Sequence, residues 1–580
     1  MTDANTPPAD SAAPDGPAAD GTAAVAPQPD KVLPPQIAEI AQGYAFGGPA
    51  LDFGAAVLDN VAYPGAQVKI PLSVMNRHGL VAGATGTGKT KTLQLMAEQL
   101  VEQGVPVFLA DIKGDLSGMA SPGMPNDKVT ARATDIGMDW RPTAYPTEFY
   151  SLGGQGKGVP IRASVSMFGP TLLAKCLSLN ETQESSLGLV FHYADSKGLW
   201  LDTIEDLRAV IQFLNSDEGK ADLKELGGLS SATAGVILRE LINFSAQGAD
   251  VFFGLPEFDT SDLLRTAPDG RGLVSMLELP AVQDRPQLFS TFLMWLLADL
   301  FHDLPEVGDV DKPKLVFFFD EAHLLFNGAS KEFLDQIQQT VRLIRSKGIG
   351  IFFVTQSPKD VPRDVLAQLG NRVQHALRAF TPDDAKALRD AIKTYPHTAY
   401  DMEKLLTSLG IGEAVITVLS ERGAPTPVAW TRMRAPESLM APSDPAVLDA
   451  AVAASPLLAK YGTAIERESA LEMLGKQAEA KDAEARAAEV EAANAKVREA
   501  AAKQAEKDRL AAEKQAAKDA AAAQKAAERD AAAAARRKAE EPGVVASVVK
   551  SSAFKSMLRS AGTVLGREIT RSIFGTSRRR

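Results

Sequence analysis

The sequence has almost no cysteine and no excess of basic charge, and each shortage narrows what the protein can be. Cys176 is the single cysteine among 580 residues, so no disulfide can form within the chain and a reducing compartment is expected. The 62 lysines and arginines are outnumbered by 73 aspartates and glutamates, which gives a net charge of −11. This balance excludes a protein coated with basic surface for nucleic acid, but it allows a local basic channel or tail.

Long hydrophobic runs are also missing. The longest apolar stretch, Leu288 to Phe301, is short for a membrane span and contains Asp299. The amino terminus lacks the basic and then apolar pattern of a secretory signal, so we expect a cytoplasmic protein. Residues 1–36 are rich in alanine, proline, aspartate and threonine and poor in large apolar side chains, which predicts a disordered leader.

A glycine-rich motif in residues 81–92, VAGATGTGKTKT, carries the strongest functional signal. It fits the phosphate-binding P-loop pattern G-x-x-x-x-G-K-[ST], preceded by an apolar strand over 78–82 and followed by a helical pattern over 91–103. This context disfavours the alternative, a glycine turn that binds nothing. The motif predicts that ATP is bound by Gly83, Ala84, Thr85, Gly86, Thr87, Gly88, Lys89, Thr90 and Lys91. In this chemistry Lys89 reaches the β- and γ-phosphates, and the Thr90 hydroxyl ligates Mg²⁺.

Two further apolar runs end in polar residues that suit the same site. Residues 315–319 are followed by Asp320 and Glu321, which predicts that Asp320 holds Mg²⁺ through its water shell and that Glu321 activates the attacking water. Residues 348–354 lead to Gln356, which can act as a γ-phosphate sensor. The alternative for Gln356 is a strand end that needs a polar residue for its turn.

Other charged residues near these runs are more ambiguous. The run 105–110 leads into Asp111, Lys113 and Asp115, which fit either the ligand edge of a parallel sheet or an ordinary charged turn. Four arginines are candidates for an arginine finger supplied to a neighbouring subunit, although each also fits a surface or salt-bridge role. They are Arg342, Arg345, Arg372 and Arg378.

The order of patterns predicts the domain organisation. We expect an α/β RecA-like P-loop NTPase domain over 37–440, with a twisted, mostly parallel sheet and a helical insertion at about 171–264. A linker over 441–463 would lead to a long Ala/Glu/Lys-rich helix, or weak coiled coil, over 464–541.

The basic amphipathic segment 542–580 suits several partners. It could bind a membrane surface, nucleic acid phosphates or a protein groove, or it could fold back on the ATPase core.

Four motifs in the same chain resemble the HerA/FtsK group of RecA-like ATPases, and most of all the bacterial HerA-like helicase C-terminal-domain family (YjgR-type). They are NRHGLVAGATGTGKT at 76–90, ADIKGD at 110–115, FFFDEAH at 317–323 and VTQSP at 354–358. The resemblance implies ATP with Mg²⁺, assembly into a ring, usually a hexamer, and movement of DNA through that ring. It assigns nucleotide and Mg²⁺ binding to Lys89 and Thr90, the acid roles to Asp320 and Glu321, and the sensor role to Gln356.

Two functions therefore stand at this stage. The first is an ATP-hydrolysing motor that translocates DNA. The alternative is a nucleotide-switched scaffold or membrane-associated assembly ATPase that does not move DNA. A GTPase is disfavoured because the chain contains no Asn-Lys-x-Asp motif.

Overall fold

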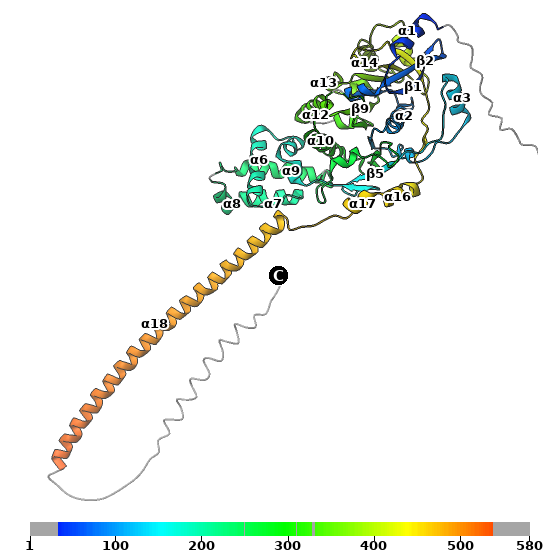
Figure 1. The fold of residues 1–580 in the computed structure, drawn as a ribbon. Helices are drawn as coiled ribbons and strands as arrows, with labels where there is room; N and C mark the ends of the chain where they lie inside the picture. Colours follow the sequence, from blue (N-terminus) through cyan, green and yellow to red (C-terminus); the bar gives the residue numbers. More distant parts are fainter. Residues whose placement is uncertain (1–32, 225, 249, 309, 327–330, 538–580) are drawn as a thin grey trace, which may run out of the picture. The chain divides into compact units, whose positions relative to one another are not determined.

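The computed structural model describes residues 33–537 except 225, 249, 309 and 327–330. The chain divides into two units, Met1–Ala478 and Glu479–Arg580. The first unit contains one twelve-stranded sheet with helices packed on both faces (Figure 1). The α/β class expected from the sequence, a sheet covered by helices, is confirmed.

The sheet has a parallel half and an antiparallel half, in the order β2-β1-β12-β11-β10-β3-β9-β8-β4-β7-β5-β6. Strands β10 to β6 in this order are parallel to one another, and the pairs from β2 to β10 are antiparallel. The parallel strands are β3 (Gly79–Ala82), β4 (Val107–Asp111), β5 (Thr147–Leu152), β6 (Val159–Ile161), β7 (Val274–Glu278), β8 (Leu315–Phe319), β9 (Ile349–Thr355) and β10 (Asn371–Gln374). The others are β1 (Ala50–Leu58), β2 (Val61–Pro71), β11 (Glu413–Thr417) and β12 (Ala429–Met433).

The central strands are apolar throughout because both of their faces are covered. In β8, Phe317 and Phe319 pack into the core on one face, whereas Val316 and Phe318 pack into the core on the other. All five residues of β8 are buried, as a parallel strand between two helix layers should be. The burial fixes the strand in place, so the polar residues that follow it are delivered to a defined point.

The helices of the first unit fall into a framework set and an insertion. Helices α5 to α9 follow one another without an intervening strand, and Figure 1 shows α6 to α9 gathered together. They are α5 (Pro170–Cys176), α6 (Glu181–Ser196), α7 (Ile204–Asn215), α8 (Asp217–Asp222) and α9 (Ser231–Ala246). The framework helices are α1 (Pro35–Gly43), α2 (Lys89–Glu102), α3 (Asp127–Ile136), α4 (Val165–Phe168), α10 (Pro286–Asp303), α11 (His323–Phe326), α12 (Lys331–Ile344), α13 (Arg363–Leu366), α14 (Pro382–Ile392) and α15 (Met402–Ser408).

The prediction that residues 441–463 form a linker is wrong. This stretch folds into α16 (Pro445–Ala454) and α17 (Pro456–Tyr461), which pack beside β5 and β6. Ser455 caps the second helix, and the Tyr461 side chain is buried with its hydroxyl 2.7 Å from Asp262 Oδ2. The prolines begin these helices at their first turns and do not break them.

The long charged helix is α18 (Ala470–Arg537), which has 68 residues. Ala470 and Leu474 are buried in the first unit, whereas residues 479–534 are exposed. Residues 1–32 and 538–580 lie outside the described part, and with them most of the leader and the basic segment 542–580. Among the described helices, none combines the length and apolarity needed to span a bilayer.

Candidate functional site

Four neighbouring strands end at the same edge of the sheet, and each is followed by residues singled out in the sequence. In the order β3-β9-β8-β4, the strands lead to the P-loop, to Gln356, to the pair Asp320 and Glu321, and to the loop with Lys113. Because parallel strands point the same way, their carboxyl ends bring these side chains together.

The P-loop is shaped by close backbone approaches. The Gly83 N–H donates to the carbonyl of Thr355, the last residue of β9, at 3.2 Å, and the Ala84 N–H donates to the carbonyl of Ala376, just after β10, at 2.8 Å. A Cβ at Gly83 would lie 2.5 Å from Cβ of His375. At the other end, Gly88 caps α2 with a φ of +114°, which favours glycine. The loop therefore presents the amino terminus of α2, where N–H groups and the helix dipole favour phosphate.

Lys89 lies beside the two acids that follow β8. It is the first residue of α2, its side chain is largely buried, and Nζ donates to the Ala84 carbonyl at 3.2 Å. Burial lowers the pKa of Lys89, and the nearby carboxylates of Glu321 and Asp320 oppose this shift. The P-loop lysine and the acidic pair, more than two hundred residues apart in the chain, are thus electrostatically coupled.

The two acids have different environments. Asp320 is 4% exposed, accepts the Glu321 N–H at 2.8 Å, and burial raises its pKa to about 7. Glu321 has a φ of +48° and forms an ion pair with Lys113 through Oε1. Burial would raise the pKa of Glu321, but Lys113, His323 and Gln356 outweigh it and lower the pKa. Burial thus disfavours the charged form of Asp320. The neighbours of Glu321, in contrast, keep that side chain a charged carboxylate.

These residues fit a magnesium nucleotide better than a free metal ion. The part of the chain that the structure describes holds no group of three or more His, Cys, Asp or Glu side chains able to bind a metal. Magnesium in nucleotide sites needs fewer protein ligands, because phosphate oxygens and waters complete its octahedron. The buried Asp320 carboxylate and the Thr90 hydroxyl at the start of α2 are the protein groups suited to that role.

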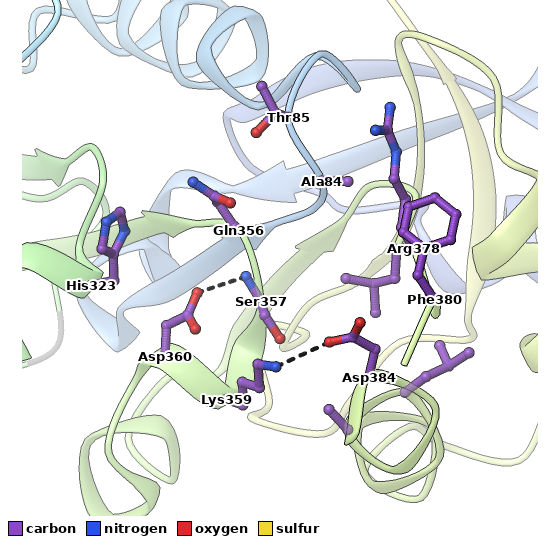
Figure 2. Close-up of a pocket in the computed structure, with 13 residues that line it drawn as sticks. Ala84, Thr85, His323, Gln356, Ser357, Lys359, Asp360, Arg378, Phe380 and Asp384 are labelled. Atoms are coloured by element: carbon purple, nitrogen blue, oxygen red, sulfur yellow. Dashed lines mark hydrogen bonds and ion pairs between the residues drawn. The ribbon is translucent and has the colours of Figure 1, made fainter. Parts of the chain in front are cut away.

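A cavity of about 400 Å³ opens between the P-loop and the segment after β10 (Figure 2). Gln356 lines it together with His323, and in the view of Figure 2 it lies between His323 and the P-loop residues Ala84 and Thr85. The turn after β9 is made by other groups, since Thr355 Oγ1 and Ser357 N–H both donate to Asp360, at 2.8 and 2.9 Å. The polar requirement of the turn therefore does not account for Gln356.

The four candidate arginines lie in different places. Arg378 lines the cavity beside the P-loop and is exposed. Arg372, in β10, donates to the Thr394 hydroxyl. Arg342 and Arg345 precede β9 and so lie toward the amino ends of the parallel strands, away from the phosphate edge. Among these four, only Arg378 lies at the cavity of its own chain.

Sequence reasoning missed several residues that the fold brings to the site. His375 packs against the P-loop at Gly83. His323 places Nδ1 3.3 Å from Oε2 of Glu321. Phe380, 83% exposed, stands at the cavity mouth. For Lys113 the sequence left two interpretations open, the ligand edge of the sheet or an ordinary charged turn, and it did not indicate a pairing with Glu321. Each follows a strand of the parallel half, so position after a buried strand was the available signal.

The fold and the phosphate-binding edge define a P-loop NTPase. The chain matches the family described as "Helicase HerA-like C-terminal" over residues 58–580, and it belongs to that family.

Among similar proteins, the DNA double-strand break repair helicase HerA of Sulfolobus acidocaldarius is 21% identical over 60% of this chain and 64% of its own length. HerA of Sulfurisphaera tokodaii is 22% identical over the same shares. The chain thus spans less than two thirds of these relatives. The bacterial conjugative coupling protein TrwBdeltaN70 is a solved structure with a TM-score of 0.46 and 16% identity, covering 70% of this chain and 99% of that one.

Proposed function

We propose that this protein is a Mg²⁺-dependent ATPase that drives DNA movement as a ring of identical subunits. The observation that carries the ATPase half is the meeting of Lys89 with Asp320 and Glu321 at the carboxyl edge of the sheet. A P-loop alone would fit many nucleotide-binding proteins. An acid placed to activate water, beside a second acid suited to Mg²⁺, favours hydrolysis.

Each residue then has a distinct task. The backbone from Gly83 to Gly88 binds the phosphates, and Lys89 contacts the β- and γ-phosphate oxygens. Thr90 and Asp320 hold Mg²⁺, which supplies positive charge to the phosphates when it is bound. Glu321 orients and deprotonates the attacking water, and Gln356 responds to the γ-phosphate from the end of β9.

The DNA half rests on the family and on the names of its relatives. The family is described as HerA-like helicase, and both HerA relatives are named as DNA double-strand break repair helicases. Ring assembly, with six copies as the expected number, is part of the same proposal. The single cysteine supports a reducing, cytoplasmic setting.

The test is ATP hydrolysis by the full chain with and without double-stranded DNA, at fixed Mg²⁺ and salt. A DNA motor should hydrolyse ATP faster with DNA, and Lys89→Ala should abolish both rates. Activity that ignores DNA but responds to lipid vesicles would overturn the motor and support a membrane-associated assembly ATPase. Light scattering with and without ATP measures the molar mass of the assembly in solution. A monomer under both conditions would contradict the proposed ring.

A further inference from the structure

Lys113 lies at the carboxyl edge of the parallel strands, and the proposed hydrolysis scheme gives this basic residue no task. It sits in the loop after β4, and Asp111 fixes that loop by accepting the N–H groups of Gly114 at 2.7 Å and Leu116 at 2.8 Å. Gly114 takes a φ of +75°, which lets the chain turn there. The backbone under Lys113 is therefore held in place, while its side chain is 51% exposed and has room to change direction.

The partner of Lys113 is the residue expected to activate water. Its ammonium donates to Oε1 of Glu321, whose side chain is only 8% exposed. The other oxygen, Oε2, makes no hydrogen bond with any described group and lies 3.3 Å from His323 Nδ1. While this pair persists, one carboxylate oxygen is occupied and its charge is neutralised, which makes Glu321 a weaker base.

The same ammonium lies within electrostatic range of the phosphate site. Its charge lowers the pKa of Lys89, and the carboxylate of Asp320 raises the pKa of Lys113. Lys89 reaches the β- and γ-phosphates in a P-loop, so a γ-phosphate held by Lys89 would lie within electrostatic range of Lys113. A terminal phosphate carries more negative charge than a carboxylate and offers three acceptor oxygens, so it competes for the ammonium.

We propose that Lys113 exchanges partners during the cycle, pairing with Glu321 as seen here and moving to the γ-phosphate when a nucleoside triphosphate occupies the P-loop. The exchange frees Glu321 only when there is a γ-phosphate to cleave. After hydrolysis the remaining diphosphate offers no such partner, and Lys113 returns to Glu321. Lys113 is thus a positioning residue for the base and a discriminator between triphosphate and diphosphate. This inference rests on the proposed ATPase function.

The test measures binding instead of turnover. Calorimetry on the full chain with Mg²⁺ gives affinities for a non-hydrolysable ATP analogue and for ADP. Lys113→Met should weaken binding of the analogue by about tenfold, the size of one charge-assisted contact, and change the affinity for ADP by less than about twofold. Lys113→Arg should restore the discrimination. Glu321→Gln should bind the analogue more tightly but leave the affinity for ADP unchanged, because it removes the carboxylate that competes with the γ-phosphate for the Lys113 ammonium.

The matched control is Lys157→Met. Lys157 is also half exposed and ion-paired, 2.6 Å from Asp449, but it lies between β5 and β6. The variant Lys157→Met should therefore leave the affinities for the ATP analogue and for ADP unchanged. Equal losses for the two nucleotides in Lys113→Met, or no loss for either, would overturn the exchange and leave the ATPase proposal standing. Failure of the unaltered protein to bind either nucleotide would overturn both.

Discussion

The Thr92 hydroxyl lies 2.8 Å from Nε2 of His375, which ties the helix behind the P-loop to the segment after β10. Nδ1 of the same ring lies 2.9 Å from the Glu413 carbonyl, so Nδ1 carries the proton and Nε2 accepts from Thr92. The ring is fully buried, and burial lowers its pKa to about 4, which keeps it neutral in this role. His375 is therefore a fixed wall against which the P-loop is packed.

Gly83→Ala should weaken the binding of a non-hydrolysable ATP analogue by about tenfold or more. The new Cβ would lie 2.5 Å from Cβ of His375 and 3.0 Å from the Thr87 hydroxyl, so the phosphate loop must shift. Calorimetry measures the affinity. Gly188→Ala is the control, because no atom lies within 4 Å of its added Cβ in α6, and it should bind normally. Equal affinities in the two variants would count against this packing.

Glu321→Gln should bind ATP but hydrolyse it about 10²- to 10⁴-fold more slowly, because the amide cannot take a proton from water. Single-turnover hydrolysis measures the rate, and filter binding measures retained ATP. The exposed Glu39→Gln on α1 serves as the control and should hydrolyse normally. Normal turnover in Glu321→Gln would remove this residue from the chemistry.

His78 should make stability depend on pH in a predictable direction. Its Nε2 lies 2.7 Å from the Val341 carbonyl, and its Nδ1 accepts the Ile351 N–H at 3.1 Å, so the ring is neutral in the fold. Burial lowers its pKa from 6.5 to about 4. The unfolded chain then binds more protons in this interval, so stability falls as pH drops from about 6.5 toward 4. For one such group the slope is at most about 1.4 kcal/mol per pH unit.

The variant His78→Asn tests that slope. Asparagine tolerates the φ of +56° at this position and does not titrate, so the variant should be less stable overall but show a shallower dependence on pH. Denaturant unfolding at several pH values between about 4.5 and 6.5 gives both quantities. Parallel curves for the two proteins would rule out a buried neutral histidine as the source.

Arg467→Ala should loosen the attachment of the first turns of α18. Arg467 makes two hydrogen bonds to Asp202, at 2.7 and 2.6 Å, and its guanidinium lies 4.2 Å from the centre of the Trp200 ring. The side chain is partly exposed, so we expect a loss of about 1 kcal/mol in local opening free energy. Hydrogen exchange of the amides in 466–474 measures it. Arg486→Ala, farther along α18, should leave exchange in 466–474 unchanged.

The sequence alone predicted the central parallel strands β3, β4, β8 and β9 and the P-loop, because these depend on local signals. Apolar runs such as 315–319 have only one stable environment, a sheet covered on both faces. Strands β1, β5, β11 and β12 were not predicted, because their burial depends on neighbours supplied by distant parts of the chain. The same cause explains the missed helices α16 and α17, whose leucines and Tyr461 become apolar anchors only beside β5 and β6.

Within the site, the sequence by itself determined which chemical groups are available: a phosphate loop, an acidic pair and a polar residue at the next strand end. Tertiary structure decided their partners. Nothing local distinguishes Lys113 from a solvated turn lysine, and only the adjacency of β4 and β8 brings it to Glu321. His375 likewise becomes the wall of the P-loop because β10 pairs with β3. Local sequence fixes what a strand end carries, whereas strand order, set by long-range packing, fixes what that end meets.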